Sequence, residues 1–502
     1  MNKAGTSSSL PSLGDNSELA SAAERRIGDR IAASIYRDPD YIDDPVLSDY
    51  VQGIWQALMA AARARGELHD ELQERFAWEV FLIRDRTVNA FALPGGYFGV
   101  HLGLISLVSN RDELAAVLGH ELSHVTQRHI SRLITQQSRQ APWLIGAMIL
   151  GALAASKNPQ AASAAMVGGQ ALAAQTQLNF SRDMEREADR VGLGVMTDAG
   201  FESRGAGTMF EKLQQASRLT DNGAFPYLRS HPLSTERIAE VQARLQLVSQ
   251  QTPASASDVD QAAKNRFLHM MMAARARVLV DPGVDLLRPM VAQAQLAMNA
   301  SGVPATPPVP DARAAGVLYA GALASAKLRD FAQAQAMTAR LQALAAGNAD
   351  ASNVAELLSL EIDLLAGKVP AAAAGMDINR PVHRADVLLR SRALLSAGRA
   401  RDVSGRLQTW VSAHPGDALA WQLLAIAYGN QNQHVRAIRA DAEARFAQLD
   451  YAGALDRLRA AQDMMRSNPA SADFMEGSII DTRARQVDLL LKEQALQDKL
   501  DR

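Results

Sequence analysis

The period of the apolar residues changes early in this chain, and that change limits its fold class. Three short apolar runs read as β strands: residues 78–85, 88–93 and 97–103. Residues 17–66 before them read as two helices, the second beginning at Pro45, and everything after Asn110 reads as helical. The sequence therefore predicts a mainly α protein with a small β-sheet.

The composition restricts the chemistry that is open to the chain. Its 502 residues favour at least two domains. Cysteine is absent, which excludes disulfides, thiolate metal sites and cysteine nucleophiles, so any metal must be held by His, Asp or Glu. Lys+Arg 52 against Asp+Glu 54 gives a formal net charge of −2, and we expect no nucleic-acid partner from that balance.

Two segments of the sequence bear on the cellular location of the protein. The first 18 residues lack the apolar core of a signal peptide, so the chain is either cytoplasmic or a mature form whose signal has been removed. Residues 141–156 carry no charge, but sixteen positions fall short of the roughly 18–20 that span a bilayer. We expect a buried or surface-lying apolar hairpin there, followed by small residues up to Ser181 that would cover a cleft.

The domain organisation follows from shifts in composition. We predict a flexible N-terminus at 1–16, a first domain at 17–248, a linker at 249–262 and a helical domain at 263–502. A fragment ending near residue 250 is expected to keep any metal ion that the first domain binds. Within the last domain, one register matches the large and small positions of a tetratricopeptide repeat: Trp421, Leu424, Ala425, Tyr428 and Ala437. This favours an α-solenoid of tetratricopeptide-like repeats over a generic Ala/Leu bundle.

The stretch LGHELSHVTQRH, Leu118 to His129, contains two histidines four positions apart. On a helix His120 and His124 project from one face about one turn apart, so they can share a metal ion. Glu121 lies beside the first histidine and can reach a metal-bound water. The alternative is a polar patch on an amphipathic helix, but the apolar neighbours predict burial, and buried polar groups need partners.

A second helix offers the missing ligand. A catalytic zinc usually has three protein ligands and one open position. In SRDMEREADRVG, residues 181–192, Glu185 and Asp189 lie on one helical face. Glu185 can complete the ligand set, and Asp189 can accept a hydrogen bond from the free ring N–H of a ligand histidine.

Four motifs in this order resemble a known family: NAFALPGG (89–96), HELSH (120–124), SRDMEREAD (181–189) and HPLSTERI (231–238). Residues 17–245 resemble the zinc metallopeptidases related to the CAAX prenyl protease. The resemblance implies a zincin fold of the gluzincin type. It also implies one zinc ion per chain on His120, His124 and Glu185, with Glu121 as the general base.

The resemblance also implies a cellular role. Members with a C-terminal tetratricopeptide domain are periplasmic, so we expect that a signal peptide has been removed from this chain. Their substrates are unfolded or misassembled outer-membrane proteins, and the repeats dock substrates or the outer-membrane β-barrel assembly machinery. A peripheral contact with a membrane surface is left open.

His231 and Arg237 have two interpretations each. His231 lies in a loop that the resemblance places near the zinc, where it would fill the fourth position and silence the enzyme, or else stabilise the oxyanion. Arg237 is a second candidate for the oxyanion. The structural alternative is that His231-Pro232 is a turn before a helix and Arg237 forms a salt bridge. His129 lies outside these motifs, and we expect a surface or structural role for it.

The turn before the third strand has a structural and a functional interpretation. Pro94-Gly95-Gly96 is an ordinary turn by itself. With the resemblance, strand 97–101 becomes a candidate edge strand that pairs with an extended substrate. The candidate substrate-binding residues are Asn89, Gly95, Gly96, Tyr97 and Phe98.

The residues predict a zinc-dependent endopeptidase, and the resemblance implies a role in protein quality control. For an enzyme with that role we expect a latent state, in which its own chain holds it inactive. The alternative is a repeat-based chaperone or scaffold whose metal site is structural or permanently shut. Intact HExxH, Glu185 and Asp189 favour the enzyme, because a scaffold has no need of Glu121.

Overall fold

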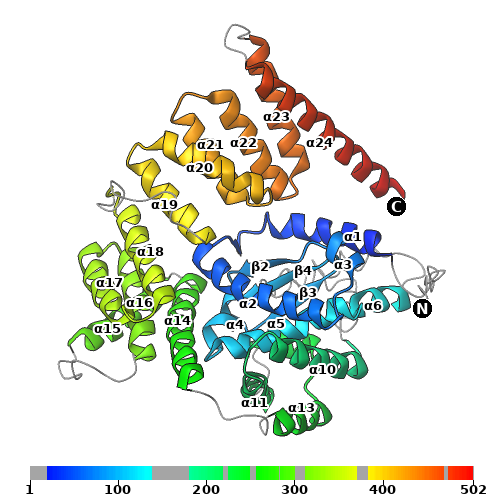
Figure 1. Cartoon of the computed structure of the whole chain (residues 1–502), viewed down its shortest axis with the longest axis vertical. Coiled ribbons are helices and arrows are strands. Elements are labelled where there is room, and N and C mark those ends of the chain that lie inside the picture. Colours follow the sequence, from blue (N-terminus) through cyan, green and yellow to red (C-terminus); the bar gives the residue numbers. More distant parts are fainter. Residues whose placement is uncertain are drawn as a thin grey trace, which may run out of the picture.

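The computed structural model describes residues 20–137, 180–218, 224–248, 256–281, 283–299, 311–369, 383–467 and 473–500. It is mainly helical with one small sheet, which confirms the predicted class (Figure 1). The expected flexible terminus at 1–16 and the apolar hairpin at 141–156 lie outside the described residues. Within the described ranges, no helix combines the length and the apolar character needed to cross a membrane.

The sheet is mixed and has four strands in the order β1-β2-β4-β3. The strands are β1 (Tyr41–Ile42), β2 (Glu79–Ile83), β3 (Ala90–Leu93) and β4 (Tyr97–His101). β2 and β4 run parallel, while β3 and β4 form an antiparallel hairpin. The three predicted strands are present, although Leu102 and Gly103 begin a helix, and the two-residue β1 carries too few residues to give a pattern.

The prediction that strand 97–101 is an edge strand is wrong. Phe98 in β4 pairs with Val80 on one side and with Ala92 on the other, so both edges of β4 are occupied. The reason is that the turn folds β3 back along one edge, while β2, separated from β4 by a longer connection, pairs with the other. The edge strand at this end of the sheet is β3.

The turn at Pro94-Gly95-Gly96 is required by packing. Gly95 and Gly96 have φ of 74° and 78°, in the region that favours glycine. A Cβ on Gly95 would lie 2.8 Å from Cα of Arg25, so the first helix rests directly on the turn. Both glycines therefore have a structural role.

The helices of the first part surround the sheet, and two of them, α5 and α10, carry the HELSH and EREAD residues. They are α1 (Ser21–Ile35), α2 (Pro45–Ala64), α3 (Asp70–Arg75), α4 (Leu102–Leu107), α5 (Arg111–Thr126), α6 (His129–Gln137), α10 (Arg182–Asp198), α11 (Arg204–Arg218), α12 (Tyr227–Ser230) and α13 (Thr235–Val248). Asn110 Oδ1 accepts a hydrogen bond from Glu113 N at 2.9 Å, which confirms the predicted start of α5.

α5 and α10 cross in direct contact. An added Cβ on Gly192 of α10 would lie 2.9 Å from the backbone of Gly119 on α5, so glycine at this crossing lets the backbones approach. Ser181 begins α10 by accepting a hydrogen bond from Met184 N at 3.2 Å. The close crossing brings the side chains of residues 120–124 and 185–189 together.

The C-terminal part is helical throughout its described residues, and successive helices pack on one another. They are α14 (Ala256–Val280), α15 (Val284–Asn299), α16 (Ala312–Lys327), α17 (Phe331–Ala345), α18 (Ala349–Leu365), α19 (Arg384–Ser396), α20 (Ala400–Ala413), α21 (Ala418–Gly429), α22 (His434–Ala447), α23 (Tyr451–Ser467) and α24 (Phe474–Leu500). Residues 256–262, which we expected in the linker, form the first turns of α14.

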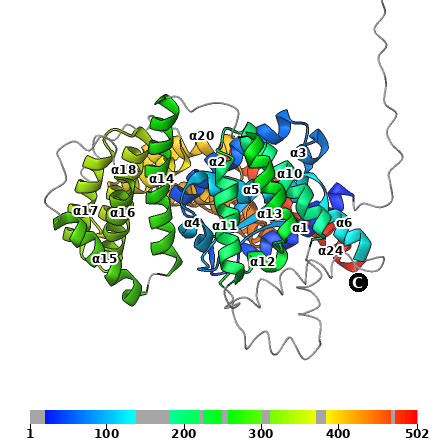
Figure 2. The ribbon, with the colours of Figure 1, turned by 90° about the horizontal axis from the view of Figure 1, so that it is seen from below.

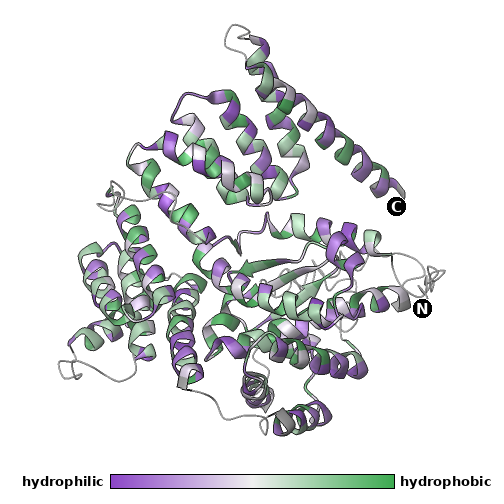
Figure 3. Ribbon diagram, viewed as in Figure 1, coloured by the Kyte–Doolittle hydropathy of each residue, from purple (hydrophilic) through white to green (hydrophobic). Residues whose placement is uncertain are grey.

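The two parts share one hydrophobic core. A single cluster of buried apolar side chains runs from Ile27 to Ala444, and a smaller one joins α22, α23 and α24. α14 packs against α4, and α14 to α18 lie on one side of the helices that surround the sheet (Figure 2). α20 to α24 lie beyond α1 in Figure 1, and Arg37, just after α1, lies 3.8 Å from Asp450. Figure 3 shows apolar and polar residues alternating along α24, which agrees with a helix packed on one face only.

Candidate metal centre

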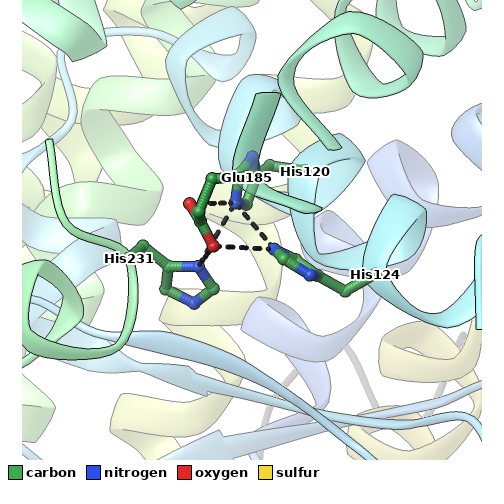
Figure 4. A group of neighbouring side chains, drawn as sticks. All are labelled: His120, His124, Glu185 and His231. Carbon is green, nitrogen blue, oxygen red and sulfur yellow. Dashed lines mark hydrogen bonds and ion pairs between the residues drawn. The ribbon is translucent and has the colours of Figure 1, made fainter. Parts of the chain in front are cut away.

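Four side chains converge between α5, α10 and the turn after α12. They are His120, His124, Glu185 and His231, and one donor atom from each lies within 4.8 Å of the others. Figure 4 shows all four pointing toward one another. Each is buried, with 5% or less of its surface exposed. Two helices that are far apart in the sequence, together with a loop, thus bring together the residues that the motifs identified.

The donor atoms are spaced as ligands of one ion would be. Nε2 of His120 lies 3.0 Å from Nε2 of His124, 3.5 Å from Oε2 of Glu185 and 3.3 Å from Nδ1 of His231. Oε1 of Glu185 lies 3.4 Å from His124 Nε2 and 3.0 Å from His231 Nδ1. Tetrahedral zinc with bonds of about 2.0–2.1 Å separates its ligand atoms by about 3.3 Å. The residues therefore fit a zinc ion.

The carboxylate of Glu121 is buried next to this group of four side chains. It is 1% exposed, and both of its carboxylate oxygens are buried without a hydrogen-bond partner among the described residues. Oε1 lies 3.4 Å from His231 Nε2. Burial raises the pKa of Glu121, although His231 and His120 oppose the rise. A buried carboxylate with so few polar contacts is costly, which points to a group bound at this centre that Glu121 serves.

Asp189 and Arg237 contact two of the proposed ligands, His120 and Glu185, and fix their side chains. Asp189 Oδ1 lies 3.0 Å from Nδ1 of His120, as predicted from the spacing. The Arg237 guanidinium donates to both oxygens of Asp189 at 2.6 and 2.8 Å, and its Nη1 lies 2.7 Å from Oε2 of Glu185. Nη1 also donates to the Pro232 carbonyl at 2.9 Å. Arg237 is thus committed to the carboxylates and to the turn, as in the structural interpretation of this residue.

The electrostatics of the protein groups reflect this crowding. Burial alone lowers the pKa of His120, but its hydrogen bonds with Asp189 and Glu185 prevail and raise it to about 10. Burial lowers the pKa of His124 well below its usual range. Burial raises the pKa of Glu185, but the three histidines around it outweigh burial and hold it well below the usual range. The carboxylate of Glu185 is therefore ionised near neutral pH, which suits a metal ligand.

Aromatic rings enclose His231. Tyr227 stacks on its imidazole with ring centroids 4.6 Å apart, and Phe180 stacks on the same imidazole with ring centroids 5.5 Å apart. Phe180 also stacks on His124 at 3.8 Å. His231 N donates to Tyr227 O at 2.9 Å, which closes the turn that presents the ring. His231 is therefore held in place by both its backbone and its ring.

Sequence reasoning missed His129. Its side chain is fully buried, and its Nδ1 lies 2.9 Å from Nδ1 of the ligand candidate His124. Its Nε2 lies 3.0 Å from Oε2 of Glu187, and burial lowers its pKa to about 4. The only signal in the sequence is its place five residues after His124, which an unbroken helix would turn away from that residue.

The predicted substrate-binding residues do not come together at the centre. Tyr97 and Phe98 are buried in the core with 1% exposure each. Tyr97 stacks on Phe81, and its hydroxyl donates to Asp29 at 2.7 Å. The strand that packs against α5 is β3, which follows Asn89. A groove of about 420 Å³ reaches Glu185 between Phe180, Arg182 and the start of α13.

The N-terminal part of the chain is similar to a known family of proteins. Residues 48–245 match the model of peptidase family M48, a family of metallopeptidases. The chain is accordingly a metalloendopeptidase. The match with this family implies a metal cofactor, and the metal in the family is typically zinc.

The relatives narrow the class further. The chain is 28% identical to the β-barrel assembly-enhancing protease of Escherichia coli over 456 residues, which are 89% of this chain and 86% of that one. It is 35% identical to a putative β-barrel assembly-enhancing protease of Vibrio cholerae over 237 residues, 47% of each chain. It is 34% identical to the mitochondrial metalloendopeptidase OMA1 of Schizosaccharomyces pombe over 165 residues, 33% of this chain and 46% of that one. The alternative of a scaffold without activity is not favoured.

Proposed function

We propose that this protein is a zinc-dependent endopeptidase whose ion is held by His120, His124 and Glu185. The observation that carries the proposal is the convergence of these buried donors at ligand spacing, with the buried carboxylate of Glu121 beside them. Bound zinc supplies a Lewis acid that polarises a peptide carbonyl and lowers the pKa of water. Glu121 takes the proton from the attacking water and passes it to the leaving amine.

His231 is the residue that restrains the enzyme in this proposal. Its Nδ1 lies among the ligand atoms, and its Nε2 lies 3.4 Å from Glu121 Oε1. The ring therefore occupies the space between the ligands and the base, where a substrate water must lie. Neutral imidazole is a good zinc ligand, so His231 would hold the fourth position until it moves away. After His231 has moved away from the metal position, its imidazole can still donate a hydrogen bond to the oxyanion that forms during peptide hydrolysis.

Arg237 is proposed as a positioning residue. Its guanidinium contacts Asp189, Glu185 and the Pro232 carbonyl, so few of its donors are left for a substrate. It fixes Asp189 against His120 and ties the His231 turn to the ligand group. The oxyanion role that the sequence left open is therefore less well supported for Arg237 than for His231.

β3 takes over the substrate-pairing role that we predicted for strand 97–101. It is the edge strand next to α5, and its backbone can add an extended chain with little dependence on sequence. Asn89 precedes it, with a buried Oδ1 that lacks a hydrogen-bond partner among the described residues. Asn89 is the one predicted substrate-binding residue that stays at this edge.

For the cellular role we propose quality control of misassembled outer-membrane proteins in the periplasm. The name and the coverage of the E. coli relative support this role. Residues 263–502 would form a tetratricopeptide-like solenoid that docks substrates or the assembly machinery. The paired packing of α16 with α17 and of α21 with α22 supports a repeat architecture.

The proposal is tested by metal analysis combined with casein digestion. Wild type should bind about one zinc ion per chain. Glu121→Gln should keep the zinc and lose proteolysis by at least about 100-fold, because the base is removed and the ligands remain. His124→Ala should lose the zinc. Stoichiometric zinc in His124→Ala, or full activity in Glu121→Gln, would overturn the assignment.

A further inference from the structure

The helix that carries HExxH ends in an unusual break. α5 stops at Thr126 and α6 starts at His129, and Arg128 between them has φ of 58°. This left-handed conformation is rare for a residue with a side chain. Arg128 Nη1 lies 3.2 Å from the buried carboxylate of Glu24, and its guanidinium lies over the ring of Phe76. The break is therefore fixed by contacts with α1 and with the segment before β2.

The break returns the chain toward the metal centre. In a continuous helix His129 would lie about 140° around the axis from His124. After the left-handed Arg128, its ring instead lies 4.9 Å from that of His124, with the two Nδ1 atoms 2.9 Å apart. Its Nε2 meets Glu187 Oε2 at 3.0 Å, on the helix that also carries Glu185. Arg132 Nη2 anchors the same oxygen at 3.2 Å.

The positions of the ring hydrogens follow from these contacts. Nε2 of His124 faces the ligand group, so as a ligand it carries a lone pair and its hydrogen is on Nδ1. Nδ1 of His129 must then accept that hydrogen, which leaves the hydrogen of a neutral His129 on Nε2. From there it is donated to the carboxylate of Glu187. A single arrangement of hydrogens satisfies all three residues.

We propose that His129 and Glu187 are positioning residues for the metal ligand His124, forming a relay that fixes its tautomer and ring orientation. The inference rests on the proposed zinc site. In this arrangement the two histidine ligands differ in how each is connected to a supporting carboxylate. His120 meets the carboxylate of Asp189 directly at 3.0 Å, whereas His124 reaches Glu187 through a second imidazole. Such outer partners raise the basicity of a ligand and typically change metal affinity by about 10–100-fold.

The test compares zinc affinities by competition with a chelator in the full chain. His129→Phe keeps a ring of similar size but can neither accept from His124 nor donate to Glu187, so its zinc affinity should fall by about 10–100-fold. His129→Asn places an amide oxygen near the position of Nδ1 and should recover part of that loss. Glu187→Gln should weaken zinc binding by less. The absorption spectrum of the Co²⁺-substituted His129→Phe protein should differ from that of wild type.

A matched control separates this role from a general effect of charge. Asp183 is on the same helix as Glu187 but is 84% exposed and contacts Arg186. Asp183→Asn should bind zinc like wild type.

Wild-type zinc affinity in both His129→Phe and Glu187→Gln, while His124→Ala loses the ion, would overturn the relay and leave the zinc site standing. Stoichiometric zinc in His124→Ala would instead overturn the proposed site. If His129→Phe does not fold, wild-type affinity in both Glu187→Gln and His129→Asn overturns the relay.

Discussion

The guanidinium of Arg275 on α14 donates two hydrogen bonds to the carboxylate of Asp44 ahead of α2, at 2.7 and 2.6 Å. Both side chains are buried, so the peptidase part and the C-terminal helices meet through a desolvated ion pair. Burial by itself raises the pKa of Asp44, but Arg275 outweighs burial and lowers it. The stabilisation is therefore present above the unfolded pKa and is lost as pH falls through the folded value.

Arg275→Met should destabilise the protein by about 3–5 kcal/mol near neutral pH, because it leaves Asp44 buried and unpaired. Chemical denaturation followed by circular dichroism measures the loss. Lys264 on the same helix forms an exposed pair with Asp260 at 2.7 Å, so Lys264→Met is the control and should change stability by less than about 1 kcal/mol. An equal effect of both substitutions would contradict the buried-pair account.

The first domain is not expected to be stable alone. His269 on α14 bonds the Val108 carbonyl at 2.8 Å and the Tyr50 hydroxyl at 2.6 Å, and the hydrophobic core continues across this contact. A fragment ending near residue 250 lacks these contacts of α14. That fragment should aggregate or melt well below the full chain. An unchanged melting temperature with retained zinc would show that α14 is dispensable.

Asp49 gives a stability change with the opposite dependence on pH. Burial is the main cause that raises its pKa to about 6, against the hydrogen bond from Ala385 N and the charge of Arg384. The unfolded value is about 3.9, so the folded state holds the extra proton and loses stability as pH rises between these values. Asp49→Asn should therefore stabilise the protein by about 1–3 kcal/mol near pH 8 and by less near pH 5.

Thermal unfolding of Asp49→Asn and wild type at the two pH values measures this difference. Asp43 provides the control, since its carboxylate pairs with Arg384 at 2.7 Å and its amide variant should destabilise the protein near neutral pH. A gain at Asp49 that does not grow with pH would show that its carboxylate is not the cause.

The site was predictable where one helix fixes the geometry. The spacing of His120 with His124 and of Glu185 with Asp189 decides which side chains share a face, and the structure brings these two faces together. The role of His129 was not predictable, because it depends on the left-handed Arg128 and on its distant anchor at Glu24. No local pattern marks such a break.

Strand pairing was also beyond the sequence pattern. Period and turn residues identified the strands, but the partner of β4 across the sheet is β2, and their register depends on contacts far apart in the chain. For that reason β4, which the sequence pattern predicts as an edge strand, is a central strand in the structure. Tyr97 and Phe98 accordingly moved from the predicted substrate edge into the core.

Asp189→Asn should weaken zinc binding by about 10–100-fold without abolishing it. The carboxylate serves His120 Nδ1 and two Arg237 donors at once, and an amide can accept from only one side. Chelator competition measures the affinity, and circular dichroism establishes that the variant is folded. A folded variant with unchanged affinity would show that this hydrogen bond does not support the ligand.

His231→Ala separates restraint from catalysis. Three proposed ligands remain in this variant, so its zinc content should equal that of wild type. If His231 occupies the water position, as its place between Glu185 and Glu121 indicates, proteolysis and self-cleavage should rise. If it instead stabilises the oxyanion, kcat should fall by about 100-fold or more. The exposed His434 at the start of α22 offers the control, because His434→Ala should leave the rate unchanged. A His231→Ala variant that is slower than wild type with its zinc intact would end the restraint hypothesis, since removal of a blocking ligand cannot slow the reaction it blocks.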